Sequence, residues 1–442
     1  MTKANSAPPD RPPLRAVRGE ILYFTDDPAV AGAGAQAHFP DGLLLIRNGL
    51  VDAVGPSAEL LPQLPAGVAV DDHRGKLILP GFIDTHVHYA QLDVIASPGE
   101  QLLSWLQKYT FPAEARFANQ EYAEAEADVF CDELLRNGTT TALAFATVHP
   151  GSADALFAAA RRRRMRMITG KVLMDRHCPD NLCDLGGTGE TETRALIERW
   201  HGRDRLGYAV TPRFPATSSA AQMEAAGRLF AEYPGLFLQS HLAENREEVA
   251  WIARMHPGVR SYLDVFARFG QLGPRSVLAH CIWIDDEDRA RMAEAGAAIS
   301  FCPTSNLFLG SGLFDLARAR AHGVRVGMGT DVGAGTSLSM LQTLGEAYKV
   351  LQLQGQKLGA EEAFYLATLG GARSLYLDAC IGSLAPGREA DFVVLDPAAT
   401  PLIARRMAQC ATLAERLFVF MTLGDDRAIH ATYILGEAVW RR

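Results

Sequence analysis

Five residues suited to metal chemistry lie far apart in the chain, and each closely follows a short apolar segment. They are His86, His88, His241, His280 and Asp331. Side chains at i and i+2 of an extended segment share one face, so the first two can bind one ion together. Imidazole nitrogens and a carboxylate oxygen suit zinc or iron. The pattern predicts a catalytic metal centre bound by His86, His88, His241 and Asp331, with His280 hydrogen-bonded to the metal-bound water.

Each of these residues alone is also typical of a satisfied core histidine, a surface imidazole or a capping aspartate. Their shared position at the ends of apolar segments favours one common site over five separate explanations.

A hydrolytic reaction follows from such a ligand set. A divalent metal lowers the pKa of a bound water toward about 7, which provides hydroxide at neutral pH. Asp331 can bind the metal and also accept a proton from the water. Glu244 lies three residues after His241, where it can carry a proton to a substrate ring nitrogen and then to a leaving amine. The alternative for Glu244 is a carboxylate on a solvent-facing loop.

The apolar segments that precede these residues predict a parallel barrel. Eight strand-like stretches are separated mostly by helical stretches, such as residues 121–136 and 220–233. The predicted strands are residues 77–83, 140–145, 167–173, 206–210, 236–240, 276–279, 297–301 and 324–329. Repeated βα units indicate an α/β fold of the (β/α)8 type, whose chemistry lies at the carboxyl ends of the strands. The candidate metal ligands are found at such ends.

Both ends of the chain are rich in β-structure instead. Predicted strands there are residues 17–24, 43–48, 51–54, 390–395 and 431–435. We therefore predict three segments, in which residues 1–74 and 385–442 form β-rich ends and residues 75–384 build the barrel.

Composition excludes several classes of protein. The chain has 442 residues, 48% of them apolar, and a net charge of −8 at pH 7, which suits a globular enzyme and argues against a nucleic-acid partner. Seven scattered cysteines form no disulfide framework and fit a reducing compartment. No signal peptide is evident, and no apolar run reaches the roughly 18 residues of a membrane helix. We expect a cytoplasmic enzyme without a membrane partner.

Residues 80–88, Pro-Gly-Phe-Ile-Asp-Thr-His-Val-His, resemble the first-strand signature of the amidohydrolase superfamily. His241, His280 and Asp331 match the remaining metal and water-orienting positions of that superfamily. The β-rich segments 1–74 and 385–442 resemble the two parts of its small composite β-sandwich. Its two-metal members usually carry a carboxylated lysine at the end of a middle strand, whereas residues 211–214 here read Thr-Pro-Arg-Phe. Lys171 lies inside another predicted strand and is a weak alternative. The His-Leu-Ala-Glu run at 241–244 is typical of the one-metal deaminase branch, which favours deamination of an aromatic ring.

Within that branch the chain resembles the guanine deaminases. The resemblance rests on three segments, namely His-Tyr-Ala-Gln at 88–91, residues 105–114 and Thr-Pro-Arg-Phe at 211–214. It implies conversion of guanine to xanthine and ammonia by attack of metal-bound hydroxide on C2. It also implies that the substrate contacts His88, Gln91, Arg213, Phe214, His241, Glu244 and Asp331.

These residue types make physical sense for guanine. A guanidinium donates well to a carbonyl oxygen and to N7, and the Gln91 amide can both donate and accept at the neighbouring N–H and C=O edge. Phe214 offers a ring that can pack on the purine. The alternatives are a loop-bonding amide for Gln91, a salt-bridge partner for Arg213 and plain core for Phe214.

The resemblance further implies one zinc ion per chain, which Fe²⁺ or Mn²⁺ can replace on ligand type, and a homodimer. Rival functions are deamination of S-adenosylhomocysteine or thioadenosine, hydrolysis of triazines and, more remotely, a non-catalytic scaffold that has lost its metal. The intact ligand set argues against the scaffold. Arg213, Phe214 and residues 105–114 argue against the other heterocycles.

Overall fold

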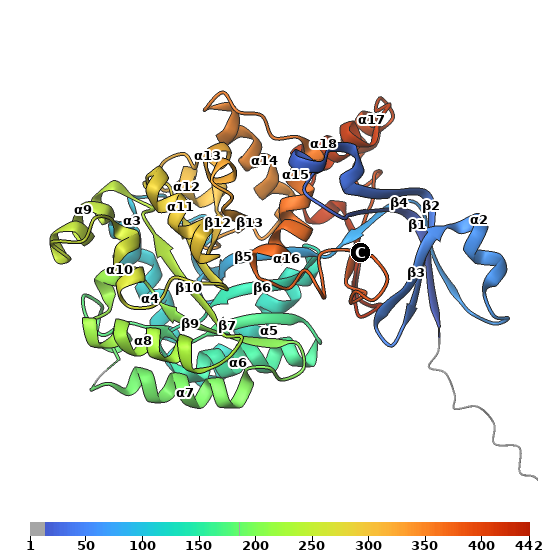
Figure 1. Ribbon diagram of the computed structural model, residues 1–442. Coiled ribbons are helices and arrows are strands. Elements are labelled where there is room, and N and C mark those ends of the chain that lie inside the picture. Colours follow the sequence, from blue (N-terminus) through green and yellow to red (C-terminus); the bar gives the residue numbers. More distant parts are fainter. Residues whose placement is uncertain (1–13, 185) are drawn as a thin grey trace, which may run out of the picture.

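Eight parallel strands form a nearly closed barrel in the computed structural model, which describes residues 14–184 and 186–442 (Figure 1). The strands follow the order β13, β12, β11, β10, β9, β7, β6, β5, and the short β8 (Val172–Leu173) pairs with β9. Their bounds are β5 (Phe82–His88), β6 (Thr139–Phe145), β7 (Arg166–Gly170), β9 (Leu206–Pro212), β10 (Phe237–Leu242), β11 (Ser276–His280), β12 (Ala298–Phe301) and β13 (Arg325–Met328). The predicted (β/α)8 barrel is confirmed.

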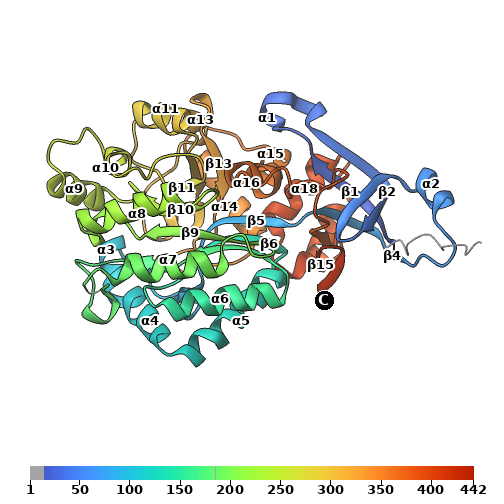
Figure 2. The same ribbon diagram turned by 60° about the horizontal axis from the view of Figure 1, so that its bottom comes forward.

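Helices connect the strands and cover the outside of the barrel, as α5 to α8 do along one side in Figure 2. The barrel helices are α3 (Leu102–Trp105), α4 (Phe111–Ala115), α5 (Gln120–Arg136), α6 (Pro150–Arg162), α7 (Thr188–Trp200), α8 (Ala220–Glu232), α9 (Arg246–Met255), α10 (Tyr262–Arg268), α11 (Asp286–Ala295), α12 (Pro303–Phe308), α13 (Leu316–Ala321), α14 (Met340–Gln352), α15 (Ala360–Tyr365) and α16 (Gly371–Ser374). A π-helical turn, η4 (Leu106–Thr110), joins α3 to α4. Among the described helices, none is long and apolar enough to cross a membrane.

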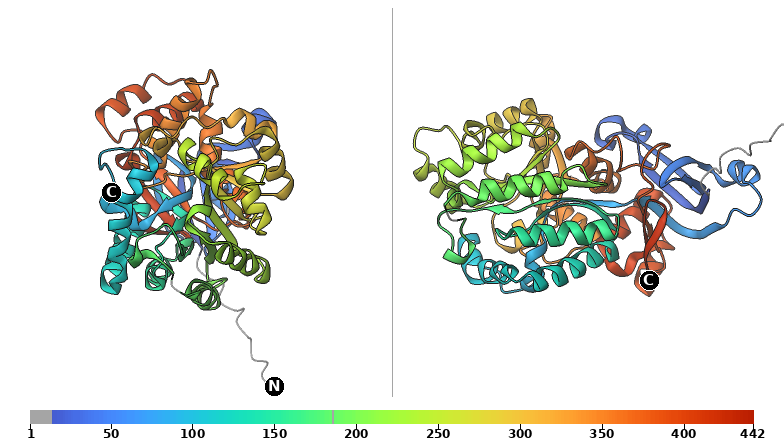
Figure 3. Two further views of the ribbon diagram at one scale, coloured as in Figure 1. Left: turned by 90° about the vertical axis from the view of Figure 1, so that its left-hand side faces the viewer. Right: turned by 90° about the horizontal axis from the view of Figure 1, so that it is seen from below.

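The two ends of the chain build one seven-stranded mixed sheet beside the barrel. Figure 3 shows the blue N-terminal and red C-terminal segments side by side at one end of the molecule. The strand order is β16 (Glu437–Arg441), β15 (Ile429–Ile434), β14 (Phe392–Leu395), β4 (Val70–Pro80), β1 (Arg15–Phe24), β2 (Gln36–Arg47) and β3 (Leu50–Pro56). The short helices α1 (Pro28–Ala31) and α2 (Ser57–Leu60) lie among the N-terminal strands. The C-terminal part also contains α17 (Pro401–Met407) and α18 (Leu413–Leu423), which the strand pattern had not indicated. The division at residues 74/75 and 384/385 stays a prediction, and β4 runs across the first boundary.

The predicted strand 77–83 is wrong as a single element. Its first half ends β4 of the mixed sheet, where Leu77 to Pro80 pair with β14, and only Phe82 and Ile83 belong to the barrel strand β5. The break falls at Gly81, whose N–H donates to the Asp391 carbonyl at 3.0 Å, while Phe82 N–H donates to the Gly138 carbonyl at 3.0 Å. The chain therefore changes hydrogen-bonding partners within one residue. Residues 77–83 are almost entirely apolar, so the sequence pattern gives no sign of this change from one sheet to the other.

An apolar layer closes the bottom of the barrel beneath the strand ends that carry the candidate site. Seven of the eight strands contribute one buried residue to it, namely Ile83, Leu143, Ile168, Ala209, Phe237, Val277 and Ala298. Layers of inward-facing side chains are typical of this fold and make the barrel a packed core. The polar groups of the site consequently lie above a rigid apolar floor.

Substituting Gly81 tests the junction between the two sheets. A Cβ at this position would lie 2.1 Å from Thr140 Oγ1 and 2.8 Å from Thr140 Cβ, so rotation of the threonine side chain cannot relieve the clash. We predict that Gly81→Ala lowers the free energy of unfolding by about 1–3 kcal/mol, the usual cost of overpacking. Urea titration measures this loss against Gly34→Ala, where a Cβ meets nothing within 4 Å. Equal stability of the two variants would contradict the prediction.

Candidate active site

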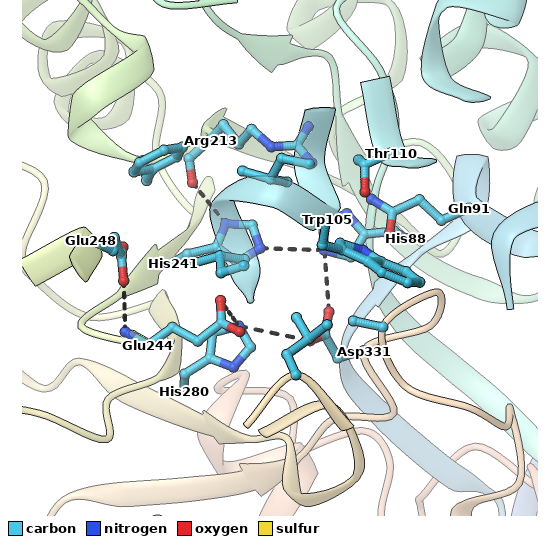
Figure 4. A pocket seen from close by; sticks show the side chains of 15 residues that line it. His88, Gln91, Trp105, Thr110, Arg213, His241, Glu244, Glu248, His280 and Asp331 are labelled. Carbon is cyan, nitrogen blue, oxygen red and sulfur yellow. Dashed lines mark hydrogen bonds and ion pairs between the residues drawn. The ribbon is translucent and has the colours of Figure 1, made fainter. Parts of the chain in front are cut away.

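The four predicted metal ligands converge on one point at the carboxyl end of the barrel. His88 Nε2 lies 3.3 Å from His86 Nε2 and 3.3 Å from His241 Nε2. Asp331 Oδ1 lies 3.2 Å from His86 Nε2 and 3.3 Å from His88 Nε2. Figure 4 shows His88, His241, Glu244, His280 and Asp331 directed at the same space. Residues separated by as many as 245 positions in the printed sequence thus present their ligand atoms together.

This donor set fits a metal ion. Ligand atoms bound tetrahedrally at about 2.0–2.1 Å lie about 3.3 Å from one another, which is the spacing found here. Burial lowers the pKa of His88 to about 4 and also lowers that of His86, so both imidazoles are unprotonated at neutral pH. Burial raises the pKa of the Asp331 carboxyl, but His86, His88 and His280 outweigh it and hold that pKa well below its usual range. Neutral imidazoles and an ionised carboxylate are the forms that metal binding requires.

We call His86, His88, His241 and Asp331 together the metal cluster, meaning the cluster of candidate metal ligands. Hydrogen bonds from other residues orient the rings and loops of this cluster. His241 Nδ1 donates to the Arg213 carbonyl at 2.7 Å, which leaves Nε2 as the free lone pair. Asp84 in β5 accepts from Thr330 Oγ1 at 2.5 Å and from the backbone N–H of Thr330 at 3.1 Å. These two bonds tie the loop that carries Asp331 to the strand that carries two of the histidines.

The backbone itself is unusual at the ligand-bearing strand ends. His280 has φ of 70° and Asp331 has φ of 51°, both in the left-handed region. Such conformations cost of the order of 1–3 kcal/mol in residues other than glycine and persist where the surrounding structure determines them. They turn both side chains toward the metal cluster at the point where each strand ends.

Glu244 is a buried acid and not a solvent-facing carboxylate. Its Oε2 lies 3.4 Å from His280 Nε2, and its Oε1 accepts from Ser311 Oγ at 3.0 Å. Burial, together with the nearby charge of Asp331, raises the pKa of Glu244 to about 8, so this group holds a proton at neutral pH. His280 Nδ1 in turn contacts Asn306 Oδ1 at 2.9 Å, and its Nε2 has no hydrogen-bond partner among the described residues. A proton donor and an unsatisfied imidazole nitrogen therefore stand beside the cluster.

The predicted substrate-reading residues line the same pocket as the metal ligands. Gln91, Arg213 and Phe214 are each at most 4% exposed and border the pocket together with Trp105 and Thr110. Arg213 lines the pocket, and its Nη1 also pairs with Glu114 Oε2 at 2.8 Å, so it is a salt-bridge partner as the alternative proposed, and its contact with a substrate stays a prediction. Phe214 likewise belongs to the hydrophobic core and to the pocket wall.

Sequence reasoning missed residues both in this pocket and behind its wall. Trp105 lines the pocket, and Glu114 contacts Gln91 and Arg213 without lining it. Both lie in the segment that carried the resemblance, yet neither had been given a role. Glu248 also lines the pocket and accepts from the backbone N–H of Glu244 at 2.9 Å. Its spacing of three residues from Asn245 is that of a capping box, which the structure contains at the start of α9. That spacing is a signal that could have placed Glu248 next to the acid.

Lys171, the weak candidate for a bridging ligand, lies elsewhere. Its Nζ is buried against Asp184, at 2.5 Å, and lies 3.1 Å from Glu192. It does not line the pocket. The ion pair explains this buried lysine without a second metal.

Comparison with known proteins agrees with this geometry. The Amidohydrolase family matches residues 77–439. Guanine deaminase of Escherichia coli (strain K12) is 52% identical over 97% of this chain and 98% of that protein, and its solved structure has a TM-score of 0.95 over 97% of this chain and 100% of that one. The structure of guanine deaminase from C. acetobutylicum, with guanine bound in its active site, is 30% identical, with a TM-score of 0.87 over 97% of this chain and 100% of that one.

Metal removal tests the cluster directly. We predict that dialysis against a chelator lowers the midpoint of thermal unfolding, because an ion that binds only the folded chain stabilises it by mass action. Adding Zn²⁺ back should restore the midpoint, and elemental analysis should find about one ion per chain, as one tetrahedral centre requires. In His241→Ala the chelator should shift the midpoint much less. An unshifted midpoint in the metal-loaded parent protein would contradict the assignment.

Proposed function

The chain belongs to the amidohydrolase family, and we propose that it is a zinc-dependent guanine deaminase that converts guanine and water to xanthine and ammonia. The observation that carries the proposal is that Gln91 and Arg213 line one pocket together with His88, His241 and Asp331, in a chain similar along its length to guanine deaminases. His86, His88, His241 and Asp331 would hold the ion. When bound, the ion supplies an acidified water as the nucleophile toward C2 of guanine.

The residues of the pocket orient the base. Arg213 donates to the carbonyl oxygen and N7, and Gln91 meets the adjacent N–H and C=O edge. Phe214 packs on the purine, which brings C2 against His88, His241, Glu244 and Asp331. Only Arg213 Nη1 is engaged in the contacts with Glu114, so the other guanidinium donors are left for the substrate.

Two carboxyl groups in different environments divide the proton transfers. Asp331, which is ionised, accepts a proton from the attacking water, and His280 orients that water through Nε2. Glu244, which is protonated, gives its proton to the ring nitrogen next to C2 as the C2–O bond forms. The proton held by Asp331 then passes to the amino group, which leaves as ammonia when the C2–N bond breaks. Glu244 assists this departure by taking the proton of the C2 hydroxyl as it becomes a carbonyl, so both carboxyl groups return to their starting states. Opposite shifts of two neighbouring carboxyl pKa values are the arrangement that such acid and base roles need.

Zinc is our choice among divalent ions because three imidazoles and one carboxylate are typical of it, with Fe²⁺ or Mn²⁺ as replacements. We further propose a cytoplasmic homodimer. All seven cysteines are free, which supports a reducing compartment.

Turnover of guanine by the metal-analysed protein tests the substrate. We predict loss of the ultraviolet band of guanine, appearance of xanthine and release of one ammonia per guanine, as hydrolysis at C2 requires. Adenosine-type substrates and triazines, tested under the same conditions, should react far more slowly. A metal-loaded protein that leaves guanine unchanged would end the substrate assignment.

Replacing the proposed acid tests the mechanism. Glu244→Gln keeps the size of the side chain but removes its proton, so kcat should fall by roughly 10²–10⁴-fold, the usual contribution of general acid–base catalysis. Metal content should stay at the parent level. Glu247→Gln, three residues along and exposed, is the matched control and should leave kcat unchanged. Near-normal turnover by Glu244→Gln would exclude the role.

A further inference from the structure

We infer that Glu114 is a positioning residue that sets the hydrogen-bonding polarity of the substrate-reading wall and thereby selects a carbonyl over an amino group on the purine. The inference rests on the proposed function, which it deepens. Glu114 lies in α4, is 1% exposed and does not itself line the pocket. It acts on the substrate only through Gln91 and Arg213.

One carboxylate holds both reading residues. Glu114 Oε1 accepts from Gln91 Nε2 at 3.0 Å and from Arg213 Nη1 at 3.0 Å, and Oε2 accepts from Arg213 Nη1 at 2.8 Å. Gln91 comes from the turn after β5, Glu114 from α4 and Arg213 from the end of β9. The three side chains therefore join separate parts of the barrel mouth into one buried network.

The network determines which way the Gln91 amide faces. An ionised carboxylate can only accept, so the amide must present Nε2 to Glu114. On its other side the backbone N–H of Gly333 donates to Gln91 Oε1 at 3.2 Å. Glu114 and Gly333 therefore favour the same orientation of the Gln91 amide. One N–H and one oxygen lone pair of that amide remain for a ligand. Without the carboxylate, a single 3.2 Å bond would hold this orientation.

The same carboxylate balances the charge of Arg213. A buried guanidinium without a partner is costly, and Glu114 makes the only ion pair of Arg213 among the described residues. The guanidinium also lies over the ring of Phe111, 5.4 Å from its centroid, three residues before Glu114 in the same helix. Charge and packing from α4 thus fix the plane in which the remaining N–H donors point.

A pocket wall with fixed hydrogen-bond donors distinguishes a carbonyl from an amino group at C6 of the purine. A carbonyl oxygen there accepts from the N–H groups of the wall. An amino group there places its own N–H donors against those of the wall, so the buried donors stay unpaired. Sites built to hydrogen-bond one group reject the analogue that cannot pair, because buried polar groups are then left unsatisfied. The role assigned to Glu114 is to keep the donors fixed, so its loss should weaken discrimination as well as binding.

The test compares guanine with 2,6-diaminopurine, which keeps the amino group at C2 but carries a second one at C6. In metal-loaded Glu114→Gln we expect KM for guanine to rise by about 10–100-fold with a smaller change in kcat. The ratio of kcat/KM for guanine to that for 2,6-diaminopurine should fall by at least about tenfold. Glu114→Asp keeps the charge on a shorter stem, so it should restore part of both effects. It also carries the test if the glutamine variant does not fold.

The matched control is Glu389→Gln. Glu389 is a partly buried carboxylate that likewise forms ion pairs, with Arg166 at 2.5 Å and Arg205 at 2.6 Å, but it lies outside the pocket. Its loss should lower stability without changing the substrate ratio. The inference is overturned if Glu114→Gln and Glu114→Asp keep the parent ratio while turning guanine over, whatever happens to their stability. Absence of guanine turnover in the parent enzyme would instead overturn the proposed function.

Discussion

The structure depends on burying one ionised carboxylate among several imidazole rings at a single point. Asp331 is 5% exposed, and its carboxylate oxygens lie 3.2 Å from His86 Nε2, 3.3 Å from His88 Nε2 and 3.8 Å from His280 Nε2. An arrangement of this kind is unfavourable unless each polar group has a partner. A bound divalent cation would satisfy the carboxylate and three of the imidazoles together. The barrel brings these groups together at the carboxyl ends of its strands, and the chemistry of the pocket follows from their proximity.

Much of the surrounding structure serves that convergence. Asp84 links the first and last barrel strands through Thr330, and burial raises the pKa of its carboxyl to about 7. His280 and Asp331 have left-handed backbone conformations where their loops leave the strands, and the apolar layer lies below them in the barrel. The strained backbone conformations and the buried Asp84 carboxyl persist here because hydrogen bonds from the surrounding structure hold them in place.

A second buried charge network shapes the other side of the pocket. Arg213 and Glu114 neutralise each other, so the wall facing the metal cluster is polar without carrying net charge. The two carboxyl groups nearest the proposed reacting position, Glu244 and Asp331, differ from each other in protonation. Glu244 is kept protonated by burial and by Asp331, whereas the imidazoles keep Asp331 ionised. One short pocket therefore holds an acid, a base and a set of fixed donors, each defined by its surroundings.

The amino-acid sequence was sufficient to predict the barrel, the β-rich chain ends and a candidate group of metal ligands. These are properties of periodicity and of residue types at strand ends, which local patterns record. Three features became visible only in the folded chain: residues 77–83 belong to two sheets, Glu244 is buried and protonated, and Glu114 joins Gln91 to Arg213. Burial and hydrogen bonding between residues about 100 positions apart depend on three-dimensional proximity, as between Glu114 and Arg213. No local pattern contains that information, because a glutamate in a short helix has the same sequence signature whether it faces water or a buried arginine.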